Sequence, residues 1–420
     1  MFVQPDNNTV ILCIAGFATF GVIARPLRIP EYFWAVLGAV VLVAFGLLPW
    51  REAAAAAGKG ADVYLFLVGM MLLSEVARLE GLFDWLAMIA VRHAKGSAKR
   101  LFFIAYGVGT LVTVFLSNDA TAVVLTPAVY AAAMAARVEP LPYLFICAFI
   151  ANAASFVLPI SNPANLVVFG AHMPPLAQWL YHFTLPSIAS ILVTYAALRF
   201  TQRRALKQSV SEPSASGPLS LGGKCVAFGI GVTAAVLLAA SALDRQLGLP
   251  TFVAGAAVTT VVLLISRQSP LAVLRNVSWG VLPLVAGLFI LVEGVQRTGI
   301  LRSIALMLHQ AATTDPRTTS LGAGAVVAFA SNLLNNLPTG LVAATVVGNA
   351  DVPAQVTSGL LIGVDLGPNL SVTGSLATIL WLIALRREGE AVTALQFLKL
   401  GMVIMPPALL TALLAMMAMP

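Results

Sequence analysis

Apolar stretches recur along the whole chain, and short polar or charged segments separate them. Roughly 20 apolar residues cross a hydrocarbon core as one helix, and a backbone in lipid must satisfy its own hydrogen bonds. The stretches are too uniformly apolar for the alternating strands of a membrane barrel. The pattern therefore predicts an all-α, multi-pass integral membrane protein. The predicted apolar segments are residues 9–24, 32–49, 61–77, 101–117, 120–136, 143–158, 176–198, 225–243, 251–266, 277–292, 319–334, 337–349, 354–385 and 395–418.

Composition agrees with this pattern and narrows the function. Of the 420 residues, 59% are hydrophobic and 10% are charged, whereas soluble domains are about a quarter charged. Cys13, Cys147 and Cys225 lie singly in or beside apolar segments, so we expect no disulfide framework. The sequence contains no GxxxxGK[ST] nucleotide loop, no metal-ligand cluster and no nucleophile constellation. We therefore expect neither an enzyme nor a protein with a cofactor or metal site.

The net charge of +7 comes from basic residues in the loops, which indicates topology and not nucleic-acid binding. If residues 101–117 and 120–136 form a hairpin that enters and leaves on one side, the basic residues divide unevenly. With the N-terminus outside, 18 of the 24 Lys and Arg residues are cytoplasmic. Because cytoplasmic loops carry the excess of basic residues, we predict that both termini lie outside. The outside basic residues are then Arg51, Lys59, Arg245, Arg297, Arg302 and Arg317.

The chain divides into two halves that can be overlaid. Thr201–Gly223 is rich in Ser, Pro, Gly and basic residues, which is typical of a flexible connector. We predict membrane repeats at 1–200 and 225–420 with a cytoplasmic linker at 201–224. Since the predicted topology places equivalent segments on opposite sides of the membrane, the repeats are inverted, as in many secondary transporters. A shift of 218 positions superposes Gly69 on Gly287, Glu75 on Glu293, Gly81 on Gly299, Asn118 on Asn336 and Thr121 on Thr339.

Two polar interruptions, Ser117–Thr121 and Asn335–Thr339, lie at equivalent places in the halves. Asn and Pro interrupt helices, and Asn accepts turn geometry while capping the next helix. Each interruption predicts the tip of a re-entrant hairpin, whose second helix points free N–H groups at the membrane midplane. Simple helix capping is the alternative, and it is compatible with binding.

A second pair of interruptions lies at residues 155–165 and 363–374, which contain Pro, Gly and Asn. Both fall in stretches long enough to span, and such residues break helices. We interpret each as a transmembrane helix that is unwound at its centre. Ordinary loops at a membrane face are the alternative.

Five acidic residues lie in or at the ends of apolar segments, where a carboxylate is costly. Asp119 and Asp365 differ from the others because each lies inside a helix break. Burial favours their neutral form, whereas Asn donors and helix dipoles favour the charged form. We therefore predict that Asp119, or failing that Asp365, carries a coupling proton. For the remaining three we favour structural functions: an ion pair or helix anchor for Glu75 and Glu293, and a favourable helix N-terminal charge for Asp62.

At these residues the chain resembles the arsenite permeases of the ion-transporter superfamily. The resemblance is carried by Ser117–Pro127 (SNDATAVVLTP) and Gly363–Ala377 (GVDLGPNLSVTGSLA), with support from Asn332–Thr339 and Ser161–Asn165. It implies a scaffold part and a transport part in a bacterial inner (plasma) membrane. It also implies export of trivalent arsenite or antimonite, driven by proton influx. Some transporters of this kind work with a soluble arsenite-stimulated ATPase, and the sequence leaves that partnership open.

The resemblance also implies which residues contact the substrate. One departure is Pro163, an extra proline within the Asn-containing break Ser161–Asn165, which puts the ligand assignment there in question. The predicted proton-coupling residues remain Asp119 first and Asp365 second. The implied substrate-binding residues are Asn118, Asn335, Asn336 and Thr339 at the tips, and Ser155, Asn162, Asn165, Asn369, Thr373 and Ser375 at the breaks.

Within the superfamily, two other activities stay open: sodium-coupled uptake of a dicarboxylate, and sodium–proton exchange. An anion at the first tip would be repelled by Asp119, and the symporter branch has a neutral residue at the corresponding place. A neutral metalloid hydroxide instead needs amide and hydroxyl partners. Capture of As(III) by thiols is disfavoured, since the three cysteines avoid all four interruptions.

Overall fold

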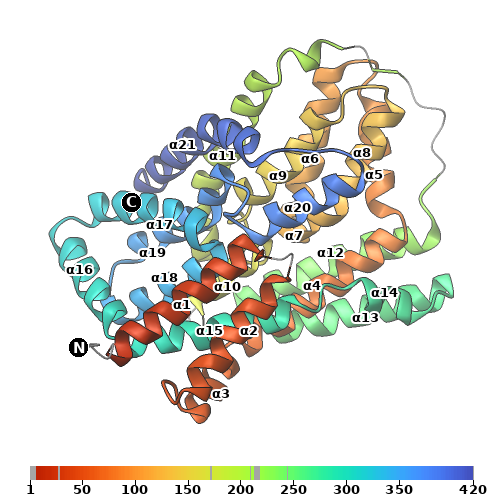
Figure 1. Ribbon diagram of the computed structural model, residues 1–420. Coiled ribbons are helices and arrows are strands. Elements are labelled where there is room, and N and C mark those ends of the chain that lie inside the picture. Colours follow the sequence, from red (N-terminus) through yellow and green to blue (C-terminus); the bar gives the residue numbers. More distant parts are fainter. Residues whose placement is uncertain are drawn as a thin grey trace.

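The computed structural model describes residues 6–26, 29–170, 173–208, 210–211, 218–243 and 245–419. Arg28, counted above among the cytoplasmic basic residues, and residues 209 and 212–217 of the predicted linker lie outside these ranges. The described chain folds into packed helices (Figure 1), which confirms the all-α prediction.

The helices of the two halves follow one another in the same order. The first half contains α1 (Asn7–Ala24), α2 (Glu31–Ala44), α3 (Trp50–Lys59), α4 (Ala61–Leu79), α5 (Leu82–His93), α6 (Ala98–Phe115), α7 (Asn118–Ala120), α8 (Thr126–Ala135), α9 (Leu141–Ala153), α10 (Pro163–Phe169) and α11 (Leu176–Thr201). The second half contains α12 (Leu221–Ala242), α13 (Gly248–Ser266), α14 (Pro270–Asn276), α15 (Val281–Arg297), α16 (Ile300–Thr314), α17 (Pro316–Leu334), α18 (Asn336–Ala350), α19 (Ala354–Leu366), α20 (Leu376–Arg387) and α21 (Ala394–Met417). α11 ends at Thr201 and α12 begins at Leu221, inside the predicted linker 201–224. The boundaries of the linker and of the two repeats stay predictions.

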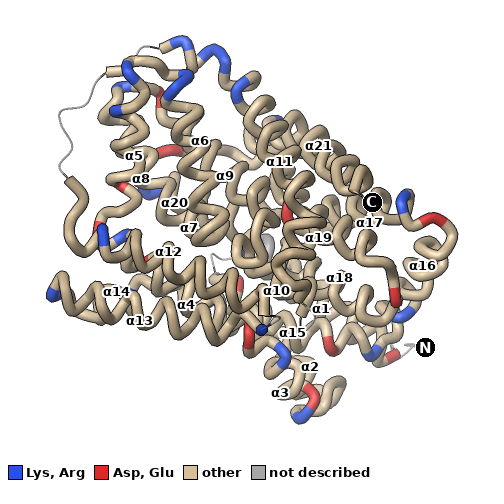
Figure 2. Tube along the Cα trace, turned by 180° about the vertical axis from the view of Figure 1, so that it is seen from behind, with Lys and Arg blue, Asp and Glu red and all other residues tan. Residues whose placement is uncertain are grey.

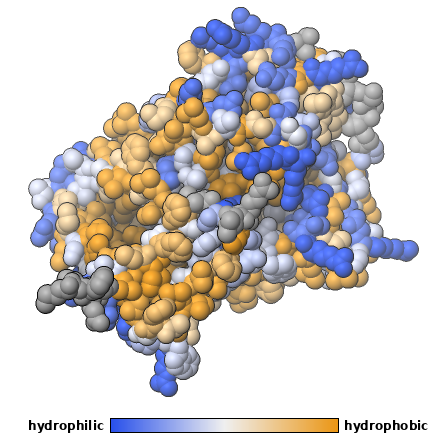
Figure 3. Space-filling model, viewed as in Figure 1, coloured by the Kyte–Doolittle hydropathy of each residue, from blue (hydrophilic) through white to orange (hydrophobic). Residues whose placement is uncertain are grey.

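Membrane-spanning character follows from length and composition. In the described part of the chain, six helices are long and apolar enough to cross a membrane. The number rises to seven if α3 and α4, which meet at a bend of 48°, count as one span. Apolar side chains cover much of the face in Figure 3. Lys and Arg lie mainly at helix ends and in loops, with a concentration at the upper end in Figure 2, above α11 and around α5 and α6.

Four helices, α3, α5, α14 and α16, were not predicted from the sequence. α3, α5 and α16 are amphipathic and therefore not continuous apolar runs. α14 has only seven residues and ends in Arg275 and Asn276. α5 and α16 connect the straight helices α4 and α15 to the hairpins that follow. Gly81 and Gly299, which are equivalent under the 218-residue shift, lie in the turns that precede α5 and α16. Their φ angles are +70° and +80°, a conformation that favours glycine.

The halves exchange helices in their packing. α4 of the first half packs on α13 of the second, and α15 of the second half packs on α2 of the first. The backbones meet closely, because a side chain on Gly69 would collide with the backbone of Thr251, and one on Gly287 with that of Ala35. α15 is the equivalent of α4, and α2 is the equivalent of α13, so the two contacts are equivalent in the two halves.

Each half also contains the predicted hairpin and broken helix. α6 with α7–α8, and α17 with α18, form the hairpins, and α9–α10 and α19–α20 are the broken helices. Each hairpin packs on the second arm of the other half's broken helix: α18 on α10, and α7 on α20. The prediction of one hairpin and one broken helix in each half is confirmed. The four interruptions are brought together between the halves.

Candidate functional site

The first hairpin tip lies between α6 and α7, where one helix ends and the next begins within three residues. The Ser117 hydroxyl accepts from the Ala120 N–H (3.3 Å), and the Asn118 side-chain oxygen accepts from the Asp119 N–H (2.9 Å). Asn118 is buried and Asp119 is half-buried. A π-helical turn follows at Thr121–Leu125, a rare form that often occurs at functional sites. The tip is therefore capped from within and continues into an irregular helix.

The second tip, between α17 and α18, is bonded to the unwound segment of its own half. The Asn335 amide donates to the Thr373 carbonyl (3.2 Å), and the Asn336 N–H donates to the Gly374 carbonyl (2.8 Å). The Thr339 hydroxyl donates to the Asn335 carbonyl (2.7 Å). Asn335 and Thr339 thus hold the tip, whereas the buried side-chain oxygen of Asn336 has no hydrogen-bond partner among the described residues.

Asn165 holds the unwound segment of the first broken helix. Its amide donates to the carbonyls of Ser155 (2.9 Å), Leu158 (3.2 Å) and Pro159 (3.3 Å). The Ser155 hydroxyl donates back to the Ala151 carbonyl (2.7 Å). Because non-helical backbone at membrane depth needs such partners, one buried side chain supplies what the missing helical turn would have supplied.

The two broken helices are bonded to each other across the halves. The Asn162 amide donates to the Asp365 carboxylate (2.8 Å), and the Asn152 amide donates to the Asn369 side-chain oxygen (3.0 Å). Asn369 in turn donates to the Phe149 carbonyl (3.0 Å). Asp365 is fully buried, and its second oxygen has no partner within the described residues. The contact joins residues about 200 positions apart in the sequence.

Asn332 completes the second break. Its side-chain oxygen accepts from the Ser371 hydroxyl (2.8 Å), and its carbonyl accepts from the Thr373 hydroxyl (3.0 Å). Ser375 caps α20 by accepting from the Thr378 N–H (3.1 Å). Thr373 and Ser375 therefore stabilise the unwound backbone in this structure.

A cavity lies beside the first tip, bounded by α4, by the turn between α14 and α15, and by the start of α10. Its polar lining consists of Ser74, Glu75, Ser117 and Asp119, together with Asn276 at the end of α14 and Ser278 in the turn. The Glu75 carboxylate accepts from Arg78 (2.9 Å) in the same helix. No hydrogen bond or ion pair to the Asp119 carboxylate occurs in the described structure. The cavity therefore presents one carboxylate without a counter-charge.

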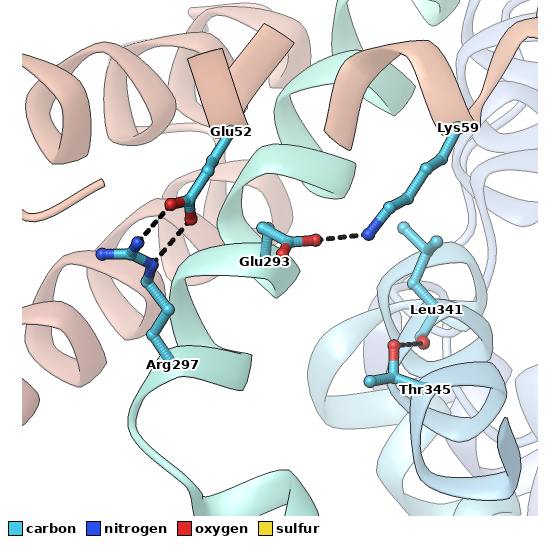
Figure 4. A network of polar contacts seen from close by, with 6 residues as sticks. All are labelled: Glu52, Lys59, Glu293, Arg297, Leu341 and Thr345. Atoms are coloured by element: carbon cyan, nitrogen blue, oxygen red, sulfur yellow. Dashed lines mark hydrogen bonds and ion pairs between the residues drawn. The ribbon is translucent and has the colours of Figure 1, made fainter. Parts of the chain in front are cut away.

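The counterpart of Glu75 in the second half, Glu293, has different surroundings (Figure 4). Lys59 of α3 donates to the Glu293 carboxylate (2.7 Å), and Arg297 donates to Glu52 of α3 (2.9 Å). The sequence analysis expected an ion pair or a helix anchor at Glu75 and Glu293. Both of these ion pairs join α15 to α3.

The second tip also differs in charge. Leu337 occupies the position equivalent to Asp119, and it lines a separate pocket with Asn335 and Pro338. The charged groups there are Arg25 and Glu31, which form an ion pair with each other (3.0 Å). Equivalent tips thus carry a carboxylate on one side and a leucine on the other.

Comparison with known proteins identifies the family of this chain. The citrate transporter family (CitMHS) matches residues 15–385. The chain belongs to the citrate transporter family. Relatives of this citrate transporter family member include the arsenical pump membrane proteins of Yersinia enterocolitica and of Escherichia coli K12. They are 26% and 25% identical to this chain over 361 residues. Each alignment covers 83% of this chain and 84% of the relative. An uncharacterized transporter of Mycobacterium tuberculosis is 26% identical over 414 residues, covering 94% of this chain and 95% of its own length.

Solved structures agree on the fold. The YdaH transporter of Alcanivorax borkumensis covers 99% of this chain and 97% of its own with a TM-score of 0.55 and 16% identity. MtrF of Neisseria gonorrhoeae covers 99% and 95% with a TM-score of 0.57 and 12% identity. The family match and the arsenical pump relatives show that the protein is a membrane transporter of the ion-transporter type and not an enzyme. The resemblance to arsenite permeases seen in the motifs is confirmed by the relatives.

Two bonded residues were missed by the sequence analysis. Asn152 bridges the broken helices, and Asn332 binds the second break, but neither was assigned to the site. Asn152 lies at the end of an apolar run, three residues before Ser155, and Asn332 begins a motif that was used only for the resemblance. Both residues could have been found from the sequence, because each is an amide side chain in an apolar helix next to a break. The carbonyl groups of an unwound segment need such donors.

Proposed function

We propose that this citrate transporter family member exports trivalent arsenite or antimonite as the neutral hydroxide, in exchange for protons that enter the cell. Support comes from its arsenical pump relatives and from the chemistry of the tips and breaks. A neutral hydroxide needs amide, hydroxyl and backbone partners, and these are the groups gathered there. The proposed contacts are Asn118, Asn335, Asn336, Thr339, Ser155, Asn162, Asn165, Asn369, Thr373 and Ser375.

These residues divide by what their side chains do in the structure. Asn165, Asn335 and Ser375 bond to the backbone around the interruptions, so they are proposed to position that backbone for the substrate. Asn336 has a buried oxygen without a partner among the described residues. That oxygen is proposed to accept a hydroxyl of the substrate directly.

The observation that carries the proton-coupling proposal is the unpaired Asp119 carboxylate in the cavity. A proton can bind to it or leave it without breaking an internal hydrogen bond. Asp365 is the second candidate, because it is fully buried and accepts a hydrogen bond from Asn162. A change of its charge would disturb the contact between the halves.

The alternative is transport of an anion or of sodium, since the family takes its name from citrate. A di- or tricarboxylate beside Asp119 would face a like charge, and two such charges about 4 Å apart repel by about 4 kcal/mol at an effective dielectric constant of 20. The described lining of the cavity contains no Lys or Arg side chain that would offset this repulsion. A neutral substrate avoids that cost.

Purified protein in proteoliposomes tests the proposal without any ATPase partner. Under an imposed pH gradient, we expect gradient-driven arsenite transport in the wild type and a loss of at least tenfold in Asp119→Asn, with arsenite counterflow retained. Asp315→Asn is the control, because Asp315 is exposed at the start of α17 and caps that helix.

Two results would contradict the proposal. Normal gradient-driven arsenite transport in Asp119→Asn would exclude Asp119 as the carrier and make Asp365→Asn the next variant. Transport of succinate, citrate or sodium in place of arsenite would overturn the substrate assignment.

A further inference from the structure

Five basic side chains converge on one pocket at the end of the molecule where α11 ends and α6 begins. Lys99 lies in the first turn of α6, Arg199 in the last turn of α11, and Arg203, Arg204 and Lys207 in the segment that follows α11. Together with Leu206 they line the pocket. In Figure 2 this region belongs to the concentration of Lys and Arg at the upper end. The predicted topology places this end in the cytoplasm.

Within the described residues, no acidic side chain forms an ion pair with the basic residues of this pocket. Other basic residues form ion pairs, as Arg25 does with Glu31 and Arg78 with Glu75, but none of the four ion pairs of the described structure involves the pocket residues. The positive-inside rule explains an excess of basic residues on one face, but it does not require five of them to share one concavity. Close like charges repel, and an anion bound among them would remove that repulsion.

Aromatic residues beside the pocket place it at the depth of lipid headgroups. Phe200, in the last turn of α11, is 60% exposed, and the Arg203 guanidinium lies 4.5 Å from its ring centre. Phe103 of α6 is 63% exposed and packs edge-on against Tyr195 of α11, 5.8 Å between ring centres. Exposed aromatic rings next to guanidinium groups are typical of the membrane–water interface. The pocket therefore borders a lipid-facing surface formed by α6 and α11.

We propose that this pocket binds the phosphate headgroup of an anionic phospholipid. Arg and Lys donate to phosphate oxygens, with Arg doing so in a bidentate manner. The exposed faces of α6 and α11, which include Phe103 and Leu192, lie where the acyl chains would run. Basic pockets of this kind on the cytoplasmic side bind such headgroups in other membrane proteins. A soluble phosphate shares the headgroup chemistry but would gain nothing from the apolar border.

The test uses the full-length protein, delipidated in a neutral detergent. Binding is measured by native mass spectrometry and by the thermal shift on addition of phosphatidylglycerol, cardiolipin, phosphatidylcholine or inorganic phosphate. We expect both anionic lipids to bind and stabilise the wild type and phosphatidylcholine to have no such effect. The triple variant Arg199→Gln, Arg203→Gln and Arg204→Gln should bind the anionic lipids at least tenfold more weakly. The control is Arg386→Gln with Arg387→Gln, exposed residues at the end of α20 outside the pocket, which should bind like the wild type.

Three outcomes would overturn the proposal. Equal loss of binding in the control would show that diffuse surface charge is sufficient. Stabilisation of the wild type by inorganic phosphate and not by phosphatidylglycerol would identify a soluble phosphate ligand. Unchanged lipid binding in the triple variant would show that the lipid does not bind at these arginines.

Discussion

At the scale of single residues, buried asparagines determine how the helix breaks are held. The sequence predicted the breaks because Pro, Gly and Asn interrupt apolar runs, and the breaks occur at those residues. It could not predict the contact between Asn162 and Asp365, because a spacing of about 200 residues says nothing about which side chains meet. The resemblance assigned Asn165 to the substrate, whereas in the structure its amide binds three carbonyls.

Replacement of Asn165 by alanine should destabilise the protein. The variant leaves up to three buried carbonyls without a donor, and an unsatisfied buried polar group costs about 1–3 kcal/mol. Thermal unfolding in detergent should therefore shift clearly downward. Asn349→Ala is the matched control, since Asn349 is exposed and its amide donates only to the Thr345 carbonyl of its own helix. Equal shifts in both variants would show that Asn165 does not hold the break.

At the scale of helices, the continuous apolar segments were predicted well and the amphipathic ones were missed. α5 and α16 carry polar or charged residues on one face and apolar residues on the other, which lowers the average hydropathy below that of a span. α3 is rich in alanine and also carries Arg51, Glu52 and Lys59. Two ion pairs join it to α15, and sequence spacing cannot reveal such partners.

The ion pairs between α3 and α15 should slow the local unfolding of α3 more than they raise the free energy of unfolding of the whole protein. Both pairs are partly exposed, and exposed pairs contribute about 0–1 kcal/mol. The double variant Glu52→Gln with Glu293→Gln should therefore unfold nearly like the wild type, while amide hydrogen exchange in residues 50–59 becomes several-fold faster. Glu139→Gln with Glu390→Gln, which removes two acids outside these pairs, should leave that exchange unchanged. Unaltered exchange in the first variant would mean that apolar packing alone holds α3.

At the scale of the whole molecule, the two halves form one structure. The 218-residue shift predicted equivalent halves, and the structure shows the same order of helices in each. The exchange of partners, α4 with α13 and α15 with α2, was not predictable, because the hydrophobic pattern marks which faces are buried but not what covers them.

Because the halves bury each other's helices, neither should fold alone. Residues 1–215 and 216–420, expressed separately, should be degraded or should aggregate, whereas co-expression should restore a purifiable complex that transports arsenite. A break at residue 117, within the first hairpin tip, is the control and should not be rescued by co-expression. Accumulation of either half as a monodisperse protein would contradict this dependence.

The unequal tips have an electrical consequence. Asp119 at one tip corresponds to Leu337 at the other, so under the proposed function the tips load one proton in each cycle. One proton would then enter while a neutral hydroxide leaves, and each cycle would move one net positive charge inward. A membrane potential that is negative inside would contribute about 2.3 kcal/mol per 100 mV to export. Voltage alone would then sustain extrusion when the cytoplasm and the medium have the same pH.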